Sequence, residues 1–443
     1  MSVSPFDSPL YRDLFTDVEV GQLFTDTADV RALMLVLGAL AKVQGEQGVI
    51  PEVSGAFLHR AMMELQVDPG GLTEATGQNG VTIPGLVTAL RKLLDAPEHA
   101  AYLHWGATSQ DIQDTALILR LRQALTLIAT RLERALTHLA HLADTHAATA
   151  QAARTYGQVA TPSSFGAQVA SWGWPFLAHR DRLTALRERL LVVSLSGAAG
   201  TASALGPMAA QTRTDLASAL GLADPGHGWH STRDNFAELA GWLTMLTASS
   251  GKMGEDLLHL CSSEVAEIAL PGAGGSSTMP QKQNPVLPSV MVALARHAIA
   301  LNGAVQGAAL HRGARDGAAW FTEWLSLPQL VMAAARSTTL VAQLAEKMVV
   351  RPDRMAANLN DPLGLIHAET LSFALARTMT RPKAQGEIKA MCATAQATGT
   401  PLPDLLKRRY PDLETPPLSG RGSLGAAPAE AQDFAATVRV GLT

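Results

Sequence analysis

Residues 274–285 read GGSSTMPQKQNP and form the most distinctive stretch of the 443-residue chain. Gly274 and Gly275 leave the backbone free to adopt positive φ and to move, whereas Pro280 and Pro285 stiffen the residues that follow them. Hydroxyl groups precede the first proline, and an ammonium and a side-chain amide stand between the two prolines. These groups are suited to holding a carboxylate beside a proton-transfer group. A Gly/Ser-rich surface linker is the alternative, but linkers do not usually place Lys and Asn between prolines.

Outside this stretch, the chain is dominated by long apolar segments with helical spacing. After Asp111, more than forty residues pass without Gly or Pro, and Leu117, Leu121 and Leu125 step by four. At about 1.5 Å per residue, such a helix would approach about 60 Å. Further long helices are expected at roughly 165–193, 233–262, 286–310 and 321–348. Five long helices with short connections predict an all-α, extended bundle, and no segment of useful length has strand periodicity.

The composition of the chain indicates which partners and which cellular compartment are expected. Charged residues make up 17% of the chain, which is low for the surface of a monomer and favours extensive burial between subunits. The net charge of −4 gives no support to nucleic acid or anionic membranes as partners. Cys261 and Cys392 are too few for a disulfide framework. Residues 1–12 contain no apolar signal core, and the run at 32–41 is too short to span a bilayer, so we expect a soluble cytoplasmic protein.

Residues 275–285 resemble the GSSxMPxKxNP signature of the fumarase/aspartase superfamily. The resemblance implies an all-helical homotetramer in which each active site gathers three regions from three subunits. It also implies an enzyme that adds or eliminates a group across the α and β carbons of a carboxylic acid. We expect three helical domains: a small amino-terminal one at 1–103, a central long-helix bundle with the signature loop at 104–350, and a small carboxyl-terminal one at 351–443.

The same resemblance assigns roles within the loop. Ser276 would be the general acid or base, and Ser277 would contact the substrate. Because an unassisted Ser is a poor acid or base, its pKa must be lowered by a preorganised cluster of donors. Lys282 and Asn284 would hold the carboxylate and spread the negative charge that builds on it. The alternative for Lys282 is an exposed side chain without a partner.

Residues 104–111, HWGATSQD, precede the longest predicted helix. Thr108 and Asp111 have the spacing of a capping box, so an ordinary helix cap is a strong alternative here. The segment resembles the first shared region of the superfamily, in which Thr108 and Ser109 would bind a substrate carboxylate. His104 lies where adenylosuccinate lyases place a substrate-binding His, although a structural role is common for a lone His.

Residues 153–166, ARTYGQVATPSSFG, resemble a second shared region, GRTHxQxAxPxTFG. Tyr156 stands where adenylosuccinate and argininosuccinate lyases have a catalytic His. Expelling an amine or hydroxide requires a proton donor, whereas a carboxylate that attacks a double bond within the same molecule needs none. Gln158 keeps the amide position of the region and would contact the substrate. The alternative is that the His is dispensable or that its work is done from elsewhere in the chain.

A further region, residues 312–324, resembles the segment after the signature helix in cycloisomerases of the superfamily. The resemblance suggests Arg315 as a carboxylate clamp, because its planar guanidinium suits bidentate binding. A structural ion pair of Arg315 with Asp316 or Glu323 is the alternative. The Trp residues of this region are expected in the core.

Within the superfamily, residues 6–51 and the Ile83-Pro84 element are similar to the 3-carboxy-cis,cis-muconate cycloisomerase branch. That branch lactonises a tricarboxylate in protocatechuate catabolism, through the β-ketoadipate pathway. The resemblance implies small-molecule di- or tricarboxylates as substrates. The sequence implies no metal or organic cofactor, since no His/Cys/Asp/Glu cluster has ligand spacing and no Gly-rich phosphate fingerprint follows a strand. A lyase of the adenylosuccinate or argininosuccinate kind that releases fumarate is one alternative. A non-catalytic structural member of the superfamily is the other.

Overall fold

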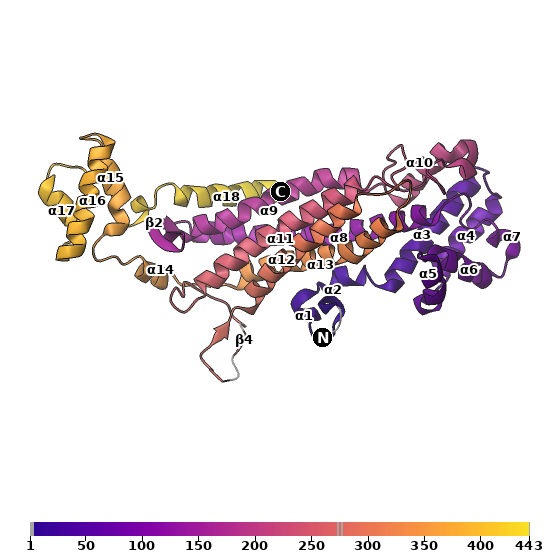
Figure 1. Cartoon of the computed structure of the whole chain (residues 1–443), viewed down its shortest axis with the longest axis horizontal. Helices are drawn as coiled ribbons and strands as arrows, with labels where there is room; N and C mark the ends of the chain where they lie inside the picture. The colour runs from indigo at the N-terminus through magenta and orange to yellow at the C-terminus, as the bar shows by residue number, and fades with distance from the viewer. Residues whose placement is uncertain (1–3, 273, 276–277, 443) are drawn as a thin grey trace. The chain divides into compact units, whose positions relative to one another are not determined.

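The computed structural model describes residues 4–272, 274–275 and 278–442, and most of these residues are helical (Figure 1). The five long helices predicted from hydrophobic spacing are confirmed, with ends close to those expected. They are α8 (Ser109–Thr145), α9 (Phe165–Leu190), α11 (Asp234–Leu260), α12 (Val286–Ala308) and α13 (Gly317–Lys347). The all-α fold class is therefore correct.

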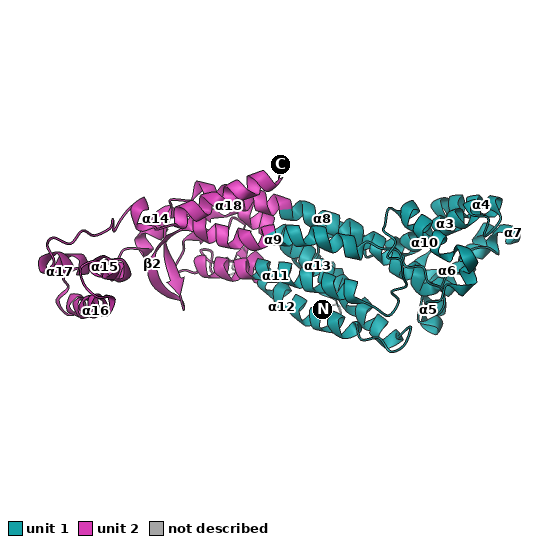
Figure 2. Ribbon diagram, turned by 90° about the horizontal axis from the view of Figure 1, so that it is seen from above, with its two compact units in different colours: residues 1–132, 178–251, 290–340 teal, residues 133–177, 252–289, 341–443 magenta. Residues whose placement is uncertain are grey.

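The chain divides into two compact units that are each discontinuous in sequence (Figure 2). Unit 1 comprises residues 1–132, 178–251 and 290–340, and unit 2 comprises residues 133–177, 252–289 and 341–443. The divisions fall inside the long helices, so each unit contains one part of every long helix. The expected three-domain division at residues 103 and 350 stays a prediction.

Unit 1 contains the amino-terminal helices, which share a hydrophobic core with the first part of α8. Helix α3 begins after Thr25, whose hydroxyl accepts the backbone N–H of Ala28 at 3.2 Å as a helix cap. Helices α3 and α4 pack closely, since a Cβ on Gly55 would come within 2.6 Å of the Ala41 carbonyl oxygen. The helices are α1 (Arg12–Phe15), α2 (Val18–Gln22), α3 (Asp26–Glu46), α4 (Glu52–Glu64), α5 (Thr73–Asn79), α6 (Ile83–Leu94), α7 (Pro97–Ala100) and α10 (Ala209–Leu220).

Unit 2 contains the carboxyl-terminal helices. Helices α15, α16 and α17 form a small hydrophobic core of their own, in which Leu371, Ile388 and Leu402 are buried. The helices are α14 (Pro352–Asn358), α15 (Ala368–Leu375), α16 (Arg381–Thr398), α17 (Leu402–Arg409) and α18 (Ala427–Leu442).

Short antiparallel strand pairs of unit 2 depart from the purely helical expectation. The longest pair, β1 (Ala150–Thr155) and β2 (Gln158–Ser164), forms a hairpin that precedes α9. The others are β3 (Ile268–Ala269) with β6 (Val349–Val350), and β4 (Gly274–Gly275) with β5 (Gln283–Asn284). The hairpin escaped prediction because its sequence lacks the alternation of apolar and polar residues that marks a half-buried strand.

Candidate active site

The two ends of the signature loop are held together as a short antiparallel pair. Gly274 pairs with Asn284 and Gly275 with Gln283, and the chain then enters α12 at Val286, as expected. The exposed Lys282 side chain makes no hydrogen bond or ion pair with another described residue. The predicted residues Ser276 and Ser277 lie outside the described residues. An exposed Lys282 without a described partner is the arrangement given above as the alternative for this residue, and its role in holding a carboxylate stays a prediction.

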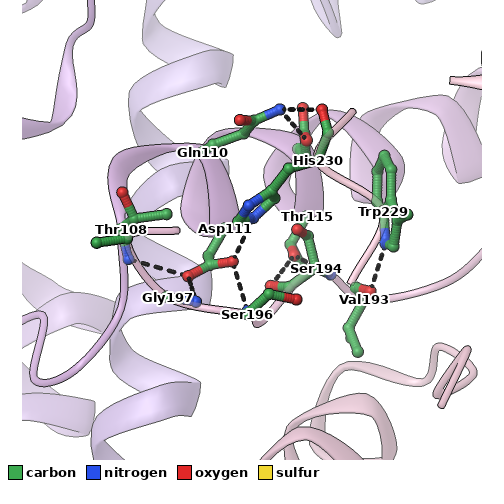
Figure 3. A network of polar contacts seen from close by, with 12 residues as sticks. Thr108, Gln110, Asp111, Thr115, Val193, Ser194, Ser196, Gly197, Trp229 and His230 are labelled. Atoms are coloured by element: carbon green, nitrogen blue, oxygen red, sulfur yellow. Dashed lines mark hydrogen bonds and ion pairs between the residues drawn. The ribbon is translucent and has the colours of Figure 1, made fainter. Parts of the chain in front are cut away.

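Asp111 organises the start of α8 in unit 1, where Ser109 is the first helical residue (Figure 3). Its carboxylate accepts the backbone N–H of Thr108 at 2.9 Å, which confirms the predicted capping contact. It also accepts the N–H groups of Ser196 at 2.8 Å and Gly197 at 3.0 Å. Nε2 of His230 lies 2.7 Å away and must carry a hydrogen, because an ionised carboxylate only accepts. Asp111 thus joins two distant chain segments to the helix start.

Arg315 and Thr108, both predicted to bind the substrate, are in direct contact. Nη2 of Arg315 donates to Oγ1 of Thr108 and to the Ala198 carbonyl oxygen, each at 3.2 Å. Nε of Arg315 donates to Oε1 of Gln110 at 3.0 Å. The structure therefore brings together two predicted groups that are 207 residues apart in sequence.

The alternative reading of Arg315, as an ion-pair partner of Asp316 or Glu323, is wrong. Both oxygens of Glu323 are taken by Arg233. Asp316 accepts the backbone N–H of Arg312 at 3.1 Å and that of Ala318 at 3.0 Å, so it caps the turn before α13. Both carboxylates have other donors, and among the described residues the acceptors of Arg315 are all neutral.

A buried ion cluster that the sequence did not predict lies beneath this contact. Arg233 donates to both oxygens of Asp114, at 2.7 and 3.0 Å, and to both oxygens of Glu323, at 3.0 and 2.6 Å. All three side chains are 1% exposed. Burial raises the pKa of Glu323, and Arg233 opposes this shift. In the sequence, Asp114 lies one turn before the apolar positions that begin at Leu117, but nothing there indicates a cation at Arg233 as its partner.

His104 precedes α8 in a strained backbone conformation. Its φ is 66°, which is uncommon for a residue with a side chain, and Gly106 follows with a φ of 71°. Nε2 of His104 is buried and has no partner among the described residues. Burial lowers the pKa of His104, so its imidazole is neutral at neutral pH. A neutral imidazole that is hydrogen-bonded to the Thr108 backbone and leaves Nε2 without a partner is compatible with the predicted substrate contact, which stays a prediction.

The tip of the β1–β2 hairpin carries Tyr156 and Gln158. Tyr156 and Gly157 form a two-residue turn with φ values of 51° and 75°, and the Tyr156 side chain is fully exposed. The exposed Gln158 side chain makes no hydrogen bond with another described residue, Lys282 and Asn284 included. The side chains of Tyr156 and Gln158 are therefore exposed and make no hydrogen bond with another described residue of unit 2.

Below the tip, in contrast, strand β1 is anchored through the buried Glu267, which binds Gln151 near the base and Arg154 nearer the turn. This carboxylate accepts from Nη1 of Arg154 at 3.2 Å, from Nε2 of Gln151 at 2.7 Å and from Nδ2 of Asn358 at 2.8 Å. Burial works to raise the pKa of Glu267, but these donors together hold it below its ordinary value. A rigid base with an unbound tip is suited to presenting Gln158 to a ligand or to another subunit.

A cavity of about 290 Å³ in unit 1 does not include the predicted site residues. It borders the ion cluster through Asp114 and Glu323 and is otherwise lined by α3 with the two residues before it, by α8 and by α13. The predicted site residues at the start of α8 are not among its lining residues. Helix α12 is long and apolar enough to cross a membrane by length and composition, a property that it shares with helices of apolar bundles.

Comparisons with known proteins agree over nearly the whole chain. A lyase family model matches residues 10–299. A 3-carboxy-cis,cis-muconate cycloisomerase of Pseudomonas aeruginosa is 37% identical over 391 residues, covering 87% of this chain and 85% of that protein. The 3-carboxy-cis,cis-muconate lactonizing enzyme from Pseudomonas putida has a similar structure, with a TM-score of 0.92 at 32% identity, covering 98% of this chain and all of that one. A fumarate lyase from Mesorhizobium sp. BNC1 follows, with a TM-score of 0.87 at 31% identity, covering 95% of this chain and 98% of that one.

Proposed function

The chain belongs to the lyase family of the fumarase/aspartase superfamily, and from this premise we propose that it is a 3-carboxy-cis,cis-muconate cycloisomerase. The reaction is the intramolecular lactonisation of carboxymuconate to carboxymuconolactone in protocatechuate catabolism. The observation that carries the proposal is full-length similarity, at 34–37% identity, to relatives with this name. A similarity that spans both units supports the same reaction rather than the same fold alone.

The reaction redistributes atoms within one molecule and needs no second substrate. A carboxylate oxygen of the substrate adds to one alkene carbon, the π electrons move toward the neighbouring carboxylate, and an aci-carboxylate forms. Ser276 then delivers a proton to the α carbon. Lys282 and Asn284 stabilise the charge that builds on the aci-carboxylate. The unpaired ammonium of Lys282 supports this assignment, because no internal partner would have to be displaced.

Two further sets of groups are proposed to bind the other carboxylates of the substrate, in active sites that gather residues from different subunits. Thr108, Ser109 and Arg315 supply donors at the start of α8, and His104 lies beside them. Gln158 at the hairpin tip supplies an amide. Tyr156 takes no part in proton transfer, since the attacking group is already an ionised carboxylate.

We also propose a cytoplasmic homotetramer with active sites shared between subunits. Helix α12 exposes the small residues Ala293, Ala300, Gly303 and Gly307 and the apolar Ile299, with Arg296 on the same face. The small residues would allow close approach of another helix, and the charge of Arg296 would have to be accommodated there. Light scattering should give four times the 46.6 kDa mass of one chain. A monomer at micromolar concentration would contradict the shared sites.

An assay of purified protein tests the reaction. Loss of carboxymuconate absorbance without release of fumarate is the expected result. Adenylosuccinate and argininosuccinate serve as parallel substrates, and turnover of either would replace this proposal with the fumarate-releasing alternative. Inactivity on all three would favour a structural member of the family.

A further inference from the structure

Gln110 is a buried polar residue whose orientation is imposed from two sides. It is fully buried on α8, and its Nε2 donates to Oδ2 of Asp114 at 3.2 Å and to the His230 carbonyl oxygen at 2.9 Å. Its Oε1 accepts from Nε of Arg315 at 3.0 Å. A flipped amide would turn its N–H groups against a guanidinium and its oxygen against a carboxylate and a carbonyl. Only one orientation therefore satisfies all partners.

The partner of Gln110 on its inner side cannot move easily. Asp114 is bound through both oxygens to Arg233, which is bound in the same way to Glu323. A fully hydrogen-bonded buried network of this kind resists displacement, because any shift leaves a charge unpaired in a low dielectric. Gln110 is thus held in place by the cluster and in turn fixes the orientation of the exposed Arg315 through its hydrogen bond.

The hydrogen bonds of Arg315 leave a defined set of donors unused. Nε and Nη2 are engaged by Gln110, Thr108 and the Ala198 carbonyl, whereas Nη1 makes no hydrogen bond with another described residue. Thr108 Oγ1 already accepts from Arg315, so its own hydroxyl hydrogen points elsewhere. The free N–H groups of Arg315 and the free O–H of Thr108 belong to side chains in contact, so they can bind one carboxylate together.

We propose that Arg315 and Thr108 form a joint carboxylate-binding pair and that Gln110 is the positioning residue that orients its guanidinium. The identity of the carboxylate as part of the lactonised substrate rests on the proposed function, but the pair and its dependence on Gln110 do not. Because Gln110 acts through Arg315, its contribution to binding exists only while Arg315 is present.

A double-mutant cycle on the full chain tests this dependence. The probe is propane-1,2,3-tricarboxylate, a saturated tricarboxylate that cannot lactonise, and its Kd is measured by isothermal titration calorimetry. Gln110→Met should weaken binding by about tenfold, the usual effect of losing one hydrogen bond near a charged group. Arg315→Met should weaken it further, and Gln110→Met should cost nothing more in the Arg315→Met background.

Thr115→Val is the matched control, because Thr115 is another fully buried polar residue of α8, hydrogen-bonded to Ser194 but not to Arg315. It should lower the melting temperature and leave Kd unchanged. If Gln110→Met does not fold, Gln110→Asn replaces it, since its shorter side chain cannot reach both Asp114 and Arg315.

Three results would overturn the proposal: no binding of the probe to the parent protein, an unchanged Kd in the Gln110 variant, or additive effects in the double variant. Gln110-dependent binding without turnover of carboxymuconate would leave this inference intact and reject the proposed reaction.

Discussion

At the start of α8, Thr108, Gln110 and Arg315 are joined by hydrogen bonds and rest on a buried ion cluster. In unit 2, by contrast, Gln158 and Lys282 make no side-chain hydrogen bond with another described residue. The first region is preorganised before any ligand binds, whereas the second offers unpaired groups. Preorganised donors lose little entropy on binding, and unpaired groups are free to follow charge as it develops. We therefore expect mutations in the first region to affect stability and ligand affinity, and mutations in the signature loop of the second to affect the chemical step.

The largest effect is expected in the signature loop. Ser276→Ala should lower kcat by at least about a thousandfold, since it removes the proposed proton donor, and should leave the melting temperature unchanged. Stopped-flow absorbance of carboxymuconate and thermal unfolding measure the two quantities. Ser289→Ala, at the first turn of α12, is the control, because its hydroxyl bonds the Pro285 carbonyl and no other described residue, so its loss should leave kcat unchanged. Activity within a few fold of the parent would remove Ser276 from the mechanism.

Mutation of the ion cluster should affect stability and not the chemical step. Arg233→Leu should lower the free energy of unfolding by about 3–5 kcal/mol, because it leaves Asp114 and Glu323 buried without a cation. Urea unfolding followed by circular dichroism measures this change. The exposed pair of Arg189 with Glu238 is the control, and Arg189→Leu should have only a small effect. Equal losses in both variants would show that the cluster does not provide the rigidity ascribed to it.

A smaller effect, on the pH dependence of stability, is expected at Glu267, which anchors strand β1 of the hairpin. The pKa of Glu267 is lower in the folded protein than its ordinary value, so its contribution to stability is present above the unfolded pKa and is lost as the pH falls through the folded one. Stability should therefore decrease below about pH 4 more steeply in the parent than in Glu267→Gln. Melting temperatures across this range test the prediction, and parallel curves for the two proteins would contradict it.

The smallest effect is expected at the exposed tip. Tyr156→His should change the rate of lactonisation by no more than about twofold, since the reaction needs no proton donor to a leaving group. Steady-state kinetics measure it. A large gain in rate would contradict this explanation. It would mean that a His at position 156 still helps the reaction, and that its replacement by Tyr is not an adaptation to a carboxylate nucleophile.

Periodicity and capping rules predicted much of the fold, because both depend on residues close in sequence. The long helices followed from apolar residues at spacings of three and four, and the cap from Thr108 and Asp111. The ion cluster could not be predicted, since Arg233 lies 119 residues from Asp114 and 90 from Glu323. The alternative partner considered for Arg315, Glu323, was wrong for the same reason, because Glu323 is bound by Arg233, which is distant in sequence. The hairpin was missed both because its strands lack alternation and because its turn has Tyr156 at a position where Asn or Asp is usual.

The pairing of Gly274 and Gly275 with Gln283 and Asn284 has a consequence for protein engineering. Both ends of the loop are fixed to each other, so an added residue between positions 276 and 282 would lengthen the loop without altering the helix that follows. An added residue after Pro285 would instead rotate the whole of α12 by about 100° relative to the loop, since each helical residue turns by that angle. Length variants on either side of this pair would thus alter chemistry and assembly separately.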